Sequence, residues 1–229
     1  MGESKDNIKA PIFGISRLRM GTDGPGITTL VTFMGCHLKC KYCINPKCHE
    51  PIYEADGTTL RKGVLMLTPR ELYDRVKIDN IYFQATGGGI CFGGGEPGLH
   101  YEFIQEFKRI CDPTWKLTIE TALGYPNRKA LPALSKIINT WIVDMKDLSD
   151  TADYVGIEGH FENAWQQLGS LRHLGLSDKE IIVKIPYIPG FQQAELKSDF
   201  LDWCSSRSLK VIKTKYLTPD EQKDRKRKM

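Results

Sequence analysis

Residues 34–43 read Met34-Gly35-Cys36-His37-Leu38-Lys39-Cys40-Lys41-Tyr42-Cys43, and this stretch sets the expectations for the rest of the chain. Its three cysteines are separated by three and then by two residues. They follow the apolar run 29–33, so we expect them on a loop that leaves a buried strand. Thiols with this spacing can converge on one metal centre, but three thiolates cannot complete a shell of four ligands.

Two kinds of metal centre are compatible with this spacing. A 4Fe–4S cluster is held by cysteine thiolates, normally four, so three protein ligands would leave one iron open for a cofactor or substrate. Zinc also binds thiolates and needs four ligands, and Cys48, His37 or His49 could supply the fourth. Zinc sites usually have a second, distant pair of ligands, whereas the downstream cysteines stand alone. The spacing therefore favours the cluster, with zinc, or no metal at all, as the alternatives.

Composition indicates an ordinary globular protein. The 229 residues are 41% hydrophobic and 26% charged, which suits one large domain. Seven cysteines without a secretory signal indicate a reduced, intracellular chain. No apolar run approaches the ~20 residues that a membrane-spanning helix needs. We therefore expect a soluble cytoplasmic protein that does not enter a membrane.

The positive charge is concentrated at the end of the chain. Residues 219–229 contain five basic and three acidic side chains, which gives +2 of the total net charge of +4. Such a run can attract nucleic acid, but more often it is simply solvated. Because nothing in the body extends it into a basic stripe, no nucleic-acid partner is predicted. We divide the chain into a domain at 1–218 and a basic tail at 219–229.

Apolar strands and amphipathic helices alternate along the chain. The predicted strands are 29–33, 87–92, 116–121, 141–146, 181–190 and 209–217, and the predicted helices are 69–78, 101–111, 128–138, 161–174 and 195–206. This alternation predicts an α/β fold with a parallel sheet and right-handed crossovers. A complete barrel of this kind has eight such units in about 250 residues. Six units predict a partial (β/α)6 TIM-like barrel.

The fold prediction brings polar residues together. In parallel α/β sheets, ligands bind at the carboxyl ends of the strands. The residues expected there are Cys36, Cys40, Cys43, Gly93, Gly94, Gly95, Glu96, Glu120, Thr121, Asp144, Lys146, Lys184, Tyr216 and Leu217. Asp23, in the glycine-rich turn 21–27, is a further candidate to face this edge. The shared placement predicts one site with a metal centre, exposed backbone and several charges.

At this point the sequence resembles the radical S-adenosylmethionine (radical SAM) superfamily. The cysteine spacing, with Tyr42 before the third cysteine, is typical of it, as is Gly94-Gly95-Glu96 after the second strand. More narrowly, the chain resembles the glycyl-radical-enzyme activating enzymes, the family of the pyruvate formate-lyase activases. This narrower likeness includes the segments 22–27, 85–96, 143–146 and 188–190, and covers roughly residues 12–217.

The resemblance implies roles for particular residues. Cys36, Cys40 and Cys43 would hold a 4Fe–4S cluster, and S-adenosylmethionine would cap the fourth iron; these cysteines and Lys146 are the implied catalytic residues. The implied cofactor-binding residues are Tyr42, Cys43, Ile44, Gly94, Gly95, Glu96, Asp144, Met145, Lys146 and Lys184. The resemblance also implies a monovalent cation at Glu120, Thr121 and Asp144. Leu217 stands where the activase carries a histidine, so one cofactor contact would be missing.

The implied activity is reductive cleavage of S-adenosylmethionine to a 5′-deoxyadenosyl radical, which would take a hydrogen atom from a glycine of a partner enzyme. A flavodoxin- or ferredoxin-type protein would supply the electron, and the chain would be a monomer. One alternative is a radical SAM enzyme that acts on a small molecule or a peptide natural product. Another is a zinc-stabilised binding protein without catalysis.

Overall fold

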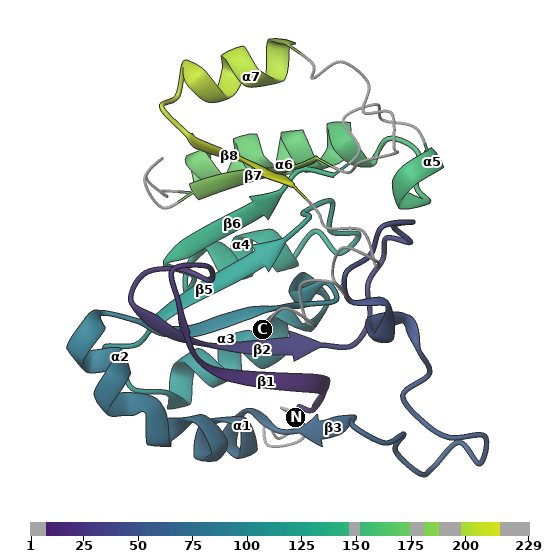
Figure 1. The fold of residues 1–229 in the computed structure, drawn as a ribbon, viewed down its shortest axis with the longest axis vertical. Helices are drawn as coiled ribbons and strands as arrows, with labels where there is room; N and C mark the ends of the chain where they lie inside the picture. Colours follow the sequence, from purple (N-terminus) through teal and green to yellow (C-terminus); the bar gives the residue numbers. More distant parts are fainter. Residues whose placement is uncertain (1–7, 147–151, 175–180, 188–197, 216–229) are drawn as a thin grey trace, which may run out of the picture.

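An eight-stranded sheet organises the computed structural model, which describes residues 8–146, 152–174, 181–187 and 198–215 (Figure 1). The strand order in the sheet is β3-β1-β2-β4-β5-β6-β7-β8. The strands are β1 (Ala10–Met20), β2 (Ile27–Phe33), β3 (Leu65–Leu67), β4 (Gly89–Gly94), β5 (Lys116–Thr121), β6 (Thr140–Asp144), β7 (Ile181–Tyr187) and β8 (Lys210–Lys215).

The six predicted strands form the parallel part of this sheet. β2 pairs with β4, and β4 to β8 pair in chain order, all in parallel. Their carboxyl ends therefore lie along one edge. The sheet is not closed within the described residues, because β3 and β8 are its two outer strands. The prediction of an α/β partial barrel of the TIM-like type is thus confirmed.

Helices connect successive parallel strands and pack side by side. α1 contacts α3, α3 contacts α4, and α4 contacts α6, so they form a layer along the sheet (Figure 1). The helices are α1 (Pro69–Val76), α2 (Asn80–Thr86), α3 (Tyr101–Ile110), α4 (Ala130–Ser135), α5 (Ala152–Val155), α6 (His160–His173) and α7 (Ser198–Ser205), with 3-10 turns η2 (Pro46–His49), η3 (Lys77–Asp79) and η4 (Pro97–His100).

The start of α1 follows directly from its sequence. The Thr68 hydroxyl accepts a hydrogen bond from the Glu71 backbone N–H at 3.2 Å, and the Glu71 carboxylate accepts one from the Thr68 N–H at 2.7 Å. This reciprocal pair satisfies two backbone donors that a helix start otherwise leaves open. Pro69 occupies the first turn, where its missing N–H costs nothing.

Two expectations need correction. The antiparallel strands β1 and β3 were not predicted. The helix predicted for 69–78 ends earlier, at Val76, and is followed by the 3-10 turn η3 and then by the separate helix α2. The break places Asp79 where its buried carboxylate accepts hydrogen bonds from the Arg17 guanidinium and from the Thr29 hydroxyl, the latter at 2.8 Å. The predicted strand ends at 188–190 and 216–217, the helix start at 195–197 and the tail lie outside the described residues.

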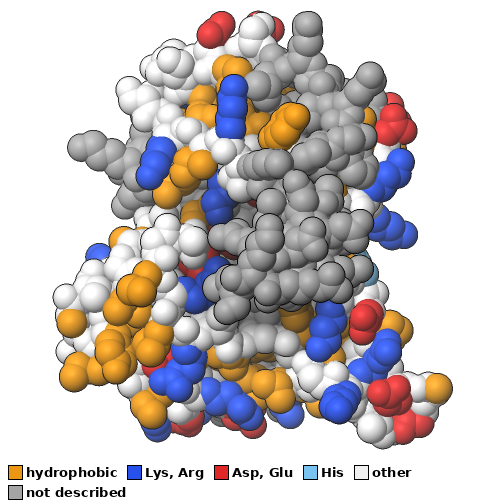
Figure 2. Space-filling model, in the orientation of Figure 1, with side chains coloured by type: hydrophobic (Ala, Val, Ile, Leu, Met, Phe, Trp, Pro, Cys, Tyr) orange, Lys and Arg blue, Asp and Glu red, His pale blue; other side chains and the backbone are white. Residues whose placement is uncertain are grey.

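The hydrophobic core fills the space between the sheet and the helices, with an aromatic cluster at the amino ends of the strands. Trp115 is 1% exposed, its ring meets those of Phe83 and Phe107, and its Nε1–H donates to Asn80 at 2.7 Å. The same end exposes apolar side chains over α2, at the lower left of Figure 2, including those of Ile81 and Tyr82. Among the described helices, none combines the length and the apolar character needed to cross a membrane.

Candidate active site

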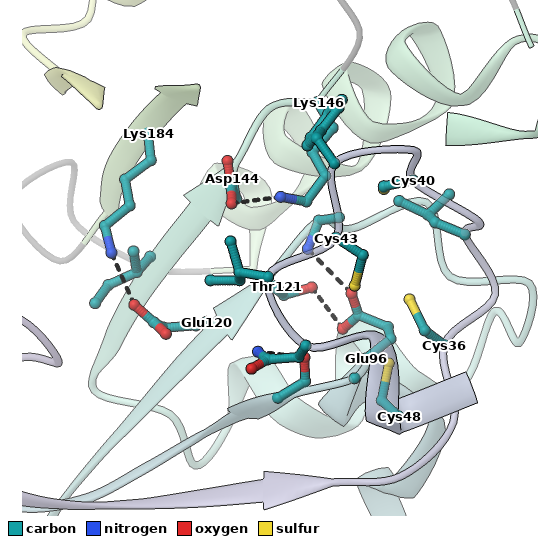
Figure 3. A pocket seen from close by; sticks show the side chains of 18 of the residues that line it. Cys36, Cys40, Cys43, Cys48, Glu96, Glu120, Thr121, Asp144, Lys146 and Lys184 are labelled. Atoms are coloured by element: carbon teal, nitrogen blue, oxygen red, sulfur yellow. Dashed lines mark hydrogen bonds and ion pairs between the residues drawn. The ribbon is translucent and has the colours of Figure 1, made fainter. Parts of the chain in front are cut away.

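A cavity of about 480 Å³ lies at the carboxyl ends of the parallel strands. Figure 3 shows Cys36, Cys40, Cys43 and Cys48 on one side of it, and Lys184 with Glu120 on the other. The predicted site residues that line it are Cys36, Cys40, Tyr42, Cys43, Ile44, Gly94, Gly95, Glu96, Glu120, Thr121, Asp144, Lys146 and Lys184. Two predicted residues within the described part of the chain do not line it: Gly93, and Met145, whose side chain lies fully buried in the hydrophobic core.

The cysteine loop is held in place by backbone hydrogen bonds and a small apolar cluster. The backbone N–H groups of Lys39 and Lys41 donate to carbonyls of residues 155 and 154, at 2.8 and 2.9 Å. Leu38 packs with Ala122 and Val155, and Cys36 and Cys40 pack against this cluster. Three residues of the loop thus anchor it to α5, while its cysteines face the cavity.

The thiols lie in two different environments. Burial raises the pKa of Cys36 to about 12, with help from the nearby Glu96 carboxylate, and raises that of Cys40 to about 11 against the opposing effect of Lys146. The pKa of Cys43 is instead lowered, chiefly by a hydrogen bond from the Cys48 thiol. A bound metal deprotonates coordinating thiols outright, so a metal bound here would convert the first two thiols to thiolates.

The glycine turn after β4 packs directly against the start of the cysteine loop. Gly95 N–H donates to the Phe33 carbonyl at 2.9 Å, and Glu96 N–H donates to the Gly35 carbonyl at 2.8 Å. A Cβ at position 95 would lie 2.0 Å from that Gly35 oxygen. Gly94 has φ +97°, which L side chains rarely adopt. Glycine is therefore required at position 95 by the contact between the two loops, and at position 94 by its positive φ.

The Glu96 carboxylate is turned away from solvent and clamps the end of β5. It accepts hydrogen bonds from the Thr121 hydroxyl at 2.8 Å, from the Ala122 N–H at 3.0 Å and from the Gly98 N–H at 3.2 Å. Burial raises its pKa to about 7, although these three donors favour the charged form. The side chain is only 1% exposed, so it positions the turn and the strand end.

Two ion pairs set the charge of the cavity wall. Lys146 Nζ lies 2.6 Å from Asp144 Oδ2 and 5.8 Å from the centre of the Tyr42 ring. Lys184 Nζ lies 2.7 Å from Glu120 Oε1. Each ammonium group is thus held by a carboxylate from its own or a nearby strand. The wall presents both charges to a ligand, which suits a zwitterionic amino acid.

The side chains implied for a monovalent cation do not fit one as they are arranged here. Glu120 is paired with Lys184, and Asp144 with Lys146. The Thr121 hydroxyl donates to Glu96 and accepts from the Leu123 N–H and the Tyr125 hydroxyl, at 2.8 to 2.9 Å. A hydroxyl has one proton and two lone pairs, so this one has no capacity left for an ion. In this structure each of the three side chains thus already has a protein partner.

The residues do fit a three-cysteine iron–sulfur cluster with a small-molecule cofactor. The three thiols come from one anchored loop and line one cavity, and the cavity volume lies in the range of ordinary cofactor sites. Among the described residues, Cys43, Cys48 and His49 also form a group whose ligand atoms lie within 4.8 Å of one another. His37, the other zinc ligand considered, lies apart from this group and packs near His160.

Several lining residues were not predicted. Asn45 donates from its side chain to the Gly94 carbonyl at 3.1 Å, which joins the cysteine loop to the glycine turn. Arg19 lines the cavity and pairs with Asp23, the one turn residue expected to face the site. Cys48 and His49 were considered only as alternative zinc ligands. The contact of Asn45 with Gly94 joins segments 49 residues apart, so no local pattern marks it, whereas Arg19 and Asp23 lie only four residues apart. Tyr216 and Leu217 lie outside the described residues.

Comparison with known proteins gives one consistent family. The radical SAM superfamily model matches residues 30–201. The chain is 31% identical over 213 residues to the pyruvate formate-lyase 2-activating enzyme of Escherichia coli K12, covering 82% of this chain and 70% of that one. It is 35% identical over 130 residues to the pyruvate formate-lyase-activating enzyme of Clostridium pasteurianum, covering 56% and 49%.

Solved structures agree at the level of the fold. SuiB of Streptococcus suis, bound to its precursor peptide SuiA, superimposes with a TM-score of 0.57 at 15% identity, over 82% of this chain and 38% of that one. QueE of Escherichia coli superimposes with a TM-score of 0.53 at 13% identity, over 93% of this chain and 96% of that one.

Proposed function

Because the chain belongs to the radical SAM superfamily and, within it, to the glycyl-radical-enzyme activating enzymes, we propose that it installs a glycyl radical on a partner enzyme. The names of its relatives point to such partners: pyruvate formate-lyase for the Escherichia coli and Clostridium proteins, and choline trimethylamine-lyase for a third, 22% identical over 238 residues. The observation that carries the proposal is the set of three thiols on one anchored loop in a cavity at the strand ends.

In this proposal Cys36, Cys40 and Cys43 hold the 4Fe–4S cluster. When bound and reduced, the cluster would supply the one electron that cleaves a carbon–sulfur bond of S-adenosylmethionine to methionine and a 5′-deoxyadenosyl radical. The chain's own contribution is to position and shield these groups. Leu38, Ala122 and Val155 exclude water behind Cys36 and Cys40.

The cofactor would be oriented by the charged wall and the glycine turn. Backbone groups of Gly94 and Gly95 would bind the methionine amino group, and Lys146 or Lys184 would face its carboxylate. Asp144 would accept hydrogen bonds from the ribose hydroxyls, and the backbone of 42–44 would face the adenine. Met145 can contribute through its backbone only, since its side chain is buried. Its N–H donates to the Lys184 carbonyl at 2.8 Å, which fixes Asp144 and Lys146 on either side.

The wider setting is part of the same proposal. The electron would come from a flavodoxin- or ferredoxin-type protein, and the enzyme would act as a cytoplasmic monomer. Residues 1–218 would form the catalytic domain, with 219–229 as a solvated basic tail.

Anaerobic reconstitution with iron and sulfide tests the first half of the proposal. We expect four irons and four sulfides per chain, and 5′-deoxyadenosine once dithionite and S-adenosylmethionine are added. Cluster uptake without any cleavage would contradict the assignment of the cavity to this cofactor. Zinc in place of iron in anaerobically purified protein would support the non-catalytic alternative.

Incubation with glycyl-radical enzymes tests the second half. The loaded enzyme, mixed with pyruvate formate-lyase or choline trimethylamine-lyase, should give the electron paramagnetic resonance doublet of a glycyl radical. A partner variant with alanine in place of the radical glycine is the matched control. Vigorous cofactor cleavage without a doublet on either partner would favour a small molecule or a peptide product as the substrate.

A further inference from the structure

A second possible metal-binding set lies beside the cluster cysteines and shares one of them. The Sγ atoms of Cys43 and Cys48 and a ring nitrogen of His49 lie within 4.8 Å of one another. Tetrahedral zinc, with bonds of ~2.3 Å to sulfur and ~2.0 Å to nitrogen, holds such atoms ~3.5–3.8 Å apart. Side-chain movements of ~1 Å would therefore close the three ligands around one ion.

The set is fixed by its backbone. Cys48 and His49 belong to the short turn η2 (Pro46–His49). The Cys48 N–H donates to the Asn45 carbonyl at 3.0 Å, and its own carbonyl accepts from the Gly35 N–H at 2.8 Å. These two backbone hydrogen bonds hold Cys48 next to the cysteine loop. This arrangement resembles a prepared site, because the ligands need little reordering to bind.

An ion can also reach the set. Cys48 is only 2% exposed, yet both it and His49 line the cavity, and His49 is exposed at the surface. Two thiolates and an imidazole are the ligands that select zinc among the common divalent ions, and magnesium and calcium prefer oxygen. The fourth position of a tetrahedral ion would be left to water.

We propose that Cys43, Cys48 and His49 bind a zinc ion when the cluster is absent, and that zinc and cluster exclude each other because both need Cys43. The mutual exclusion rests on the proposed function, because that function assigns Cys43 to the cluster. The zinc site itself does not depend on the proposed function. Zinc would hold the empty enzyme in an inactive, thiol-protected form. Cluster assembly would have to displace the ion to give the active form.

Cobalt and zinc titration of the full-length chain, without its cluster, tests the zinc set. Co²⁺ should give the strong d–d absorption of a tetrahedral site with thiolate charge-transfer bands, and Zn²⁺ should displace it. Cys48→Ala should weaken Zn²⁺ binding at least ~100-fold, and His49→Asn, at an exposed position, about tenfold. Cys40→Ala, which removes a cluster ligand outside the set, should leave zinc affinity within threefold of wild type.

The competition is tested on the reconstituted enzyme. Wild type loaded with its cluster should give no tetrahedral Co²⁺ spectrum, and prior Zn²⁺ should slow cluster uptake in wild type but not in Cys48→Ala. Equal zinc affinity in wild type and Cys48→Ala would overturn the proposal. A loss of zinc affinity in Cys40→Ala as large as that in Cys48→Ala would also overturn it. A tetrahedral Co²⁺ spectrum in the cluster-loaded enzyme would overturn the exclusion. Failure of wild type to take up any cluster would instead count against the proposed function and leave the zinc set standing.

Discussion

The two ends of the parallel strands are built in opposite ways. At the amino ends, Trp115 packs among aromatic rings and the buried Asp79 carboxylate pairs with Arg17. At the carboxyl ends, cysteines, glycines and paired charges surround a cavity. The packing at the amino ends stabilises the folded state. The arrangement at the carboxyl ends positions reactive groups, and it leaves less apolar surface buried there. Substitutions at the two ends should therefore separate stability from activity.

The largest effect is expected from Cys40→Ala. Two remaining thiolates cannot hold a 4Fe–4S cluster in the required geometry, so 5′-deoxyadenosine production should fall at least ~1,000-fold while the unfolding free energy changes by less than ~1 kcal/mol. Product is measured by chromatography after reduction. Cys111→Ala, at a cysteine of the core away from the cavity, is the matched control and should keep its cluster. Substantial activity in Cys40→Ala would refute the ligand assignment.

Trp115→Ala should have the opposite profile. Truncation of a buried tryptophan typically removes about 4 kcal/mol of unfolding free energy, and this one also leaves Asn80 without its indole partner. Chemical denaturation of the unloaded protein measures the loss. At temperatures where the variant stays folded, cofactor cleavage per bound cluster should match wild type within about twofold. A specific loss of cleavage would show that the two ends are coupled.

Glu96→Gln should change the pH dependence of stability. Burial raises the pKa of Glu96 to about 7 from an ordinary value of 4.5, so the folded chain binds the proton more tightly than the unfolded chain. Stability from this group is then present at low pH and decreases as the pH rises from about 4.5 to about 7, by about 3 kcal/mol in all. Denaturation at pH 5 and pH 8 should show a smaller decrease in the glutamine variant. Identical slopes would mean that Glu96 stays ionised.

The smallest effect is expected for Lys184→Met. Since the Lys184 ammonium occupies Glu120, replacing Na⁺ and K⁺ by choline should leave the wild-type rate within about twofold. The variant should cleave the cofactor about tenfold more slowly, because a charge that we propose to orient the cofactor is lost, and K⁺ should restore part of this rate. A wild-type enzyme that needs Na⁺ or K⁺ would reinstate the cation predicted at Glu120, Thr121 and Asp144.

The features that the sequence predicted are local ones. Each parallel strand carries apolar or β-branched residues, and α1 begins at a reciprocal cap between Thr68 and Glu71. The cysteine spacing alone places three thiols on one loop. In each case a few residues close together in the sequence determine the local structure, so it can be predicted without knowing which distant residues are in contact.

The features that the sequence did not predict depend on distant residues. β1 contains Gly14 and the polar stretch 16–19, and forms a strand because β2 and β3 flank it. The helix break after Val76 serves the pairing of Asp79 with Arg17, 62 residues away. In the site, Glu120 meets Lys184 from 64 residues away. A side-chain pair of this kind leaves no local pattern in the sequence, so the pairing of Lys184 with Glu120 was not predicted.

The hydrogen bond between Glu96 N–H and the Gly35 carbonyl constrains how this region can vary. It joins the residue before Cys36 to the residue after Gly95, and no Cβ fits between them. An insertion in either loop would move the Gly35 carbonyl or the Glu96 N–H and leave the other group without its hydrogen-bond partner. The two loops should therefore tolerate exchange between relatives only as a matched pair, and chimaeras that swap one of them should assemble poorly.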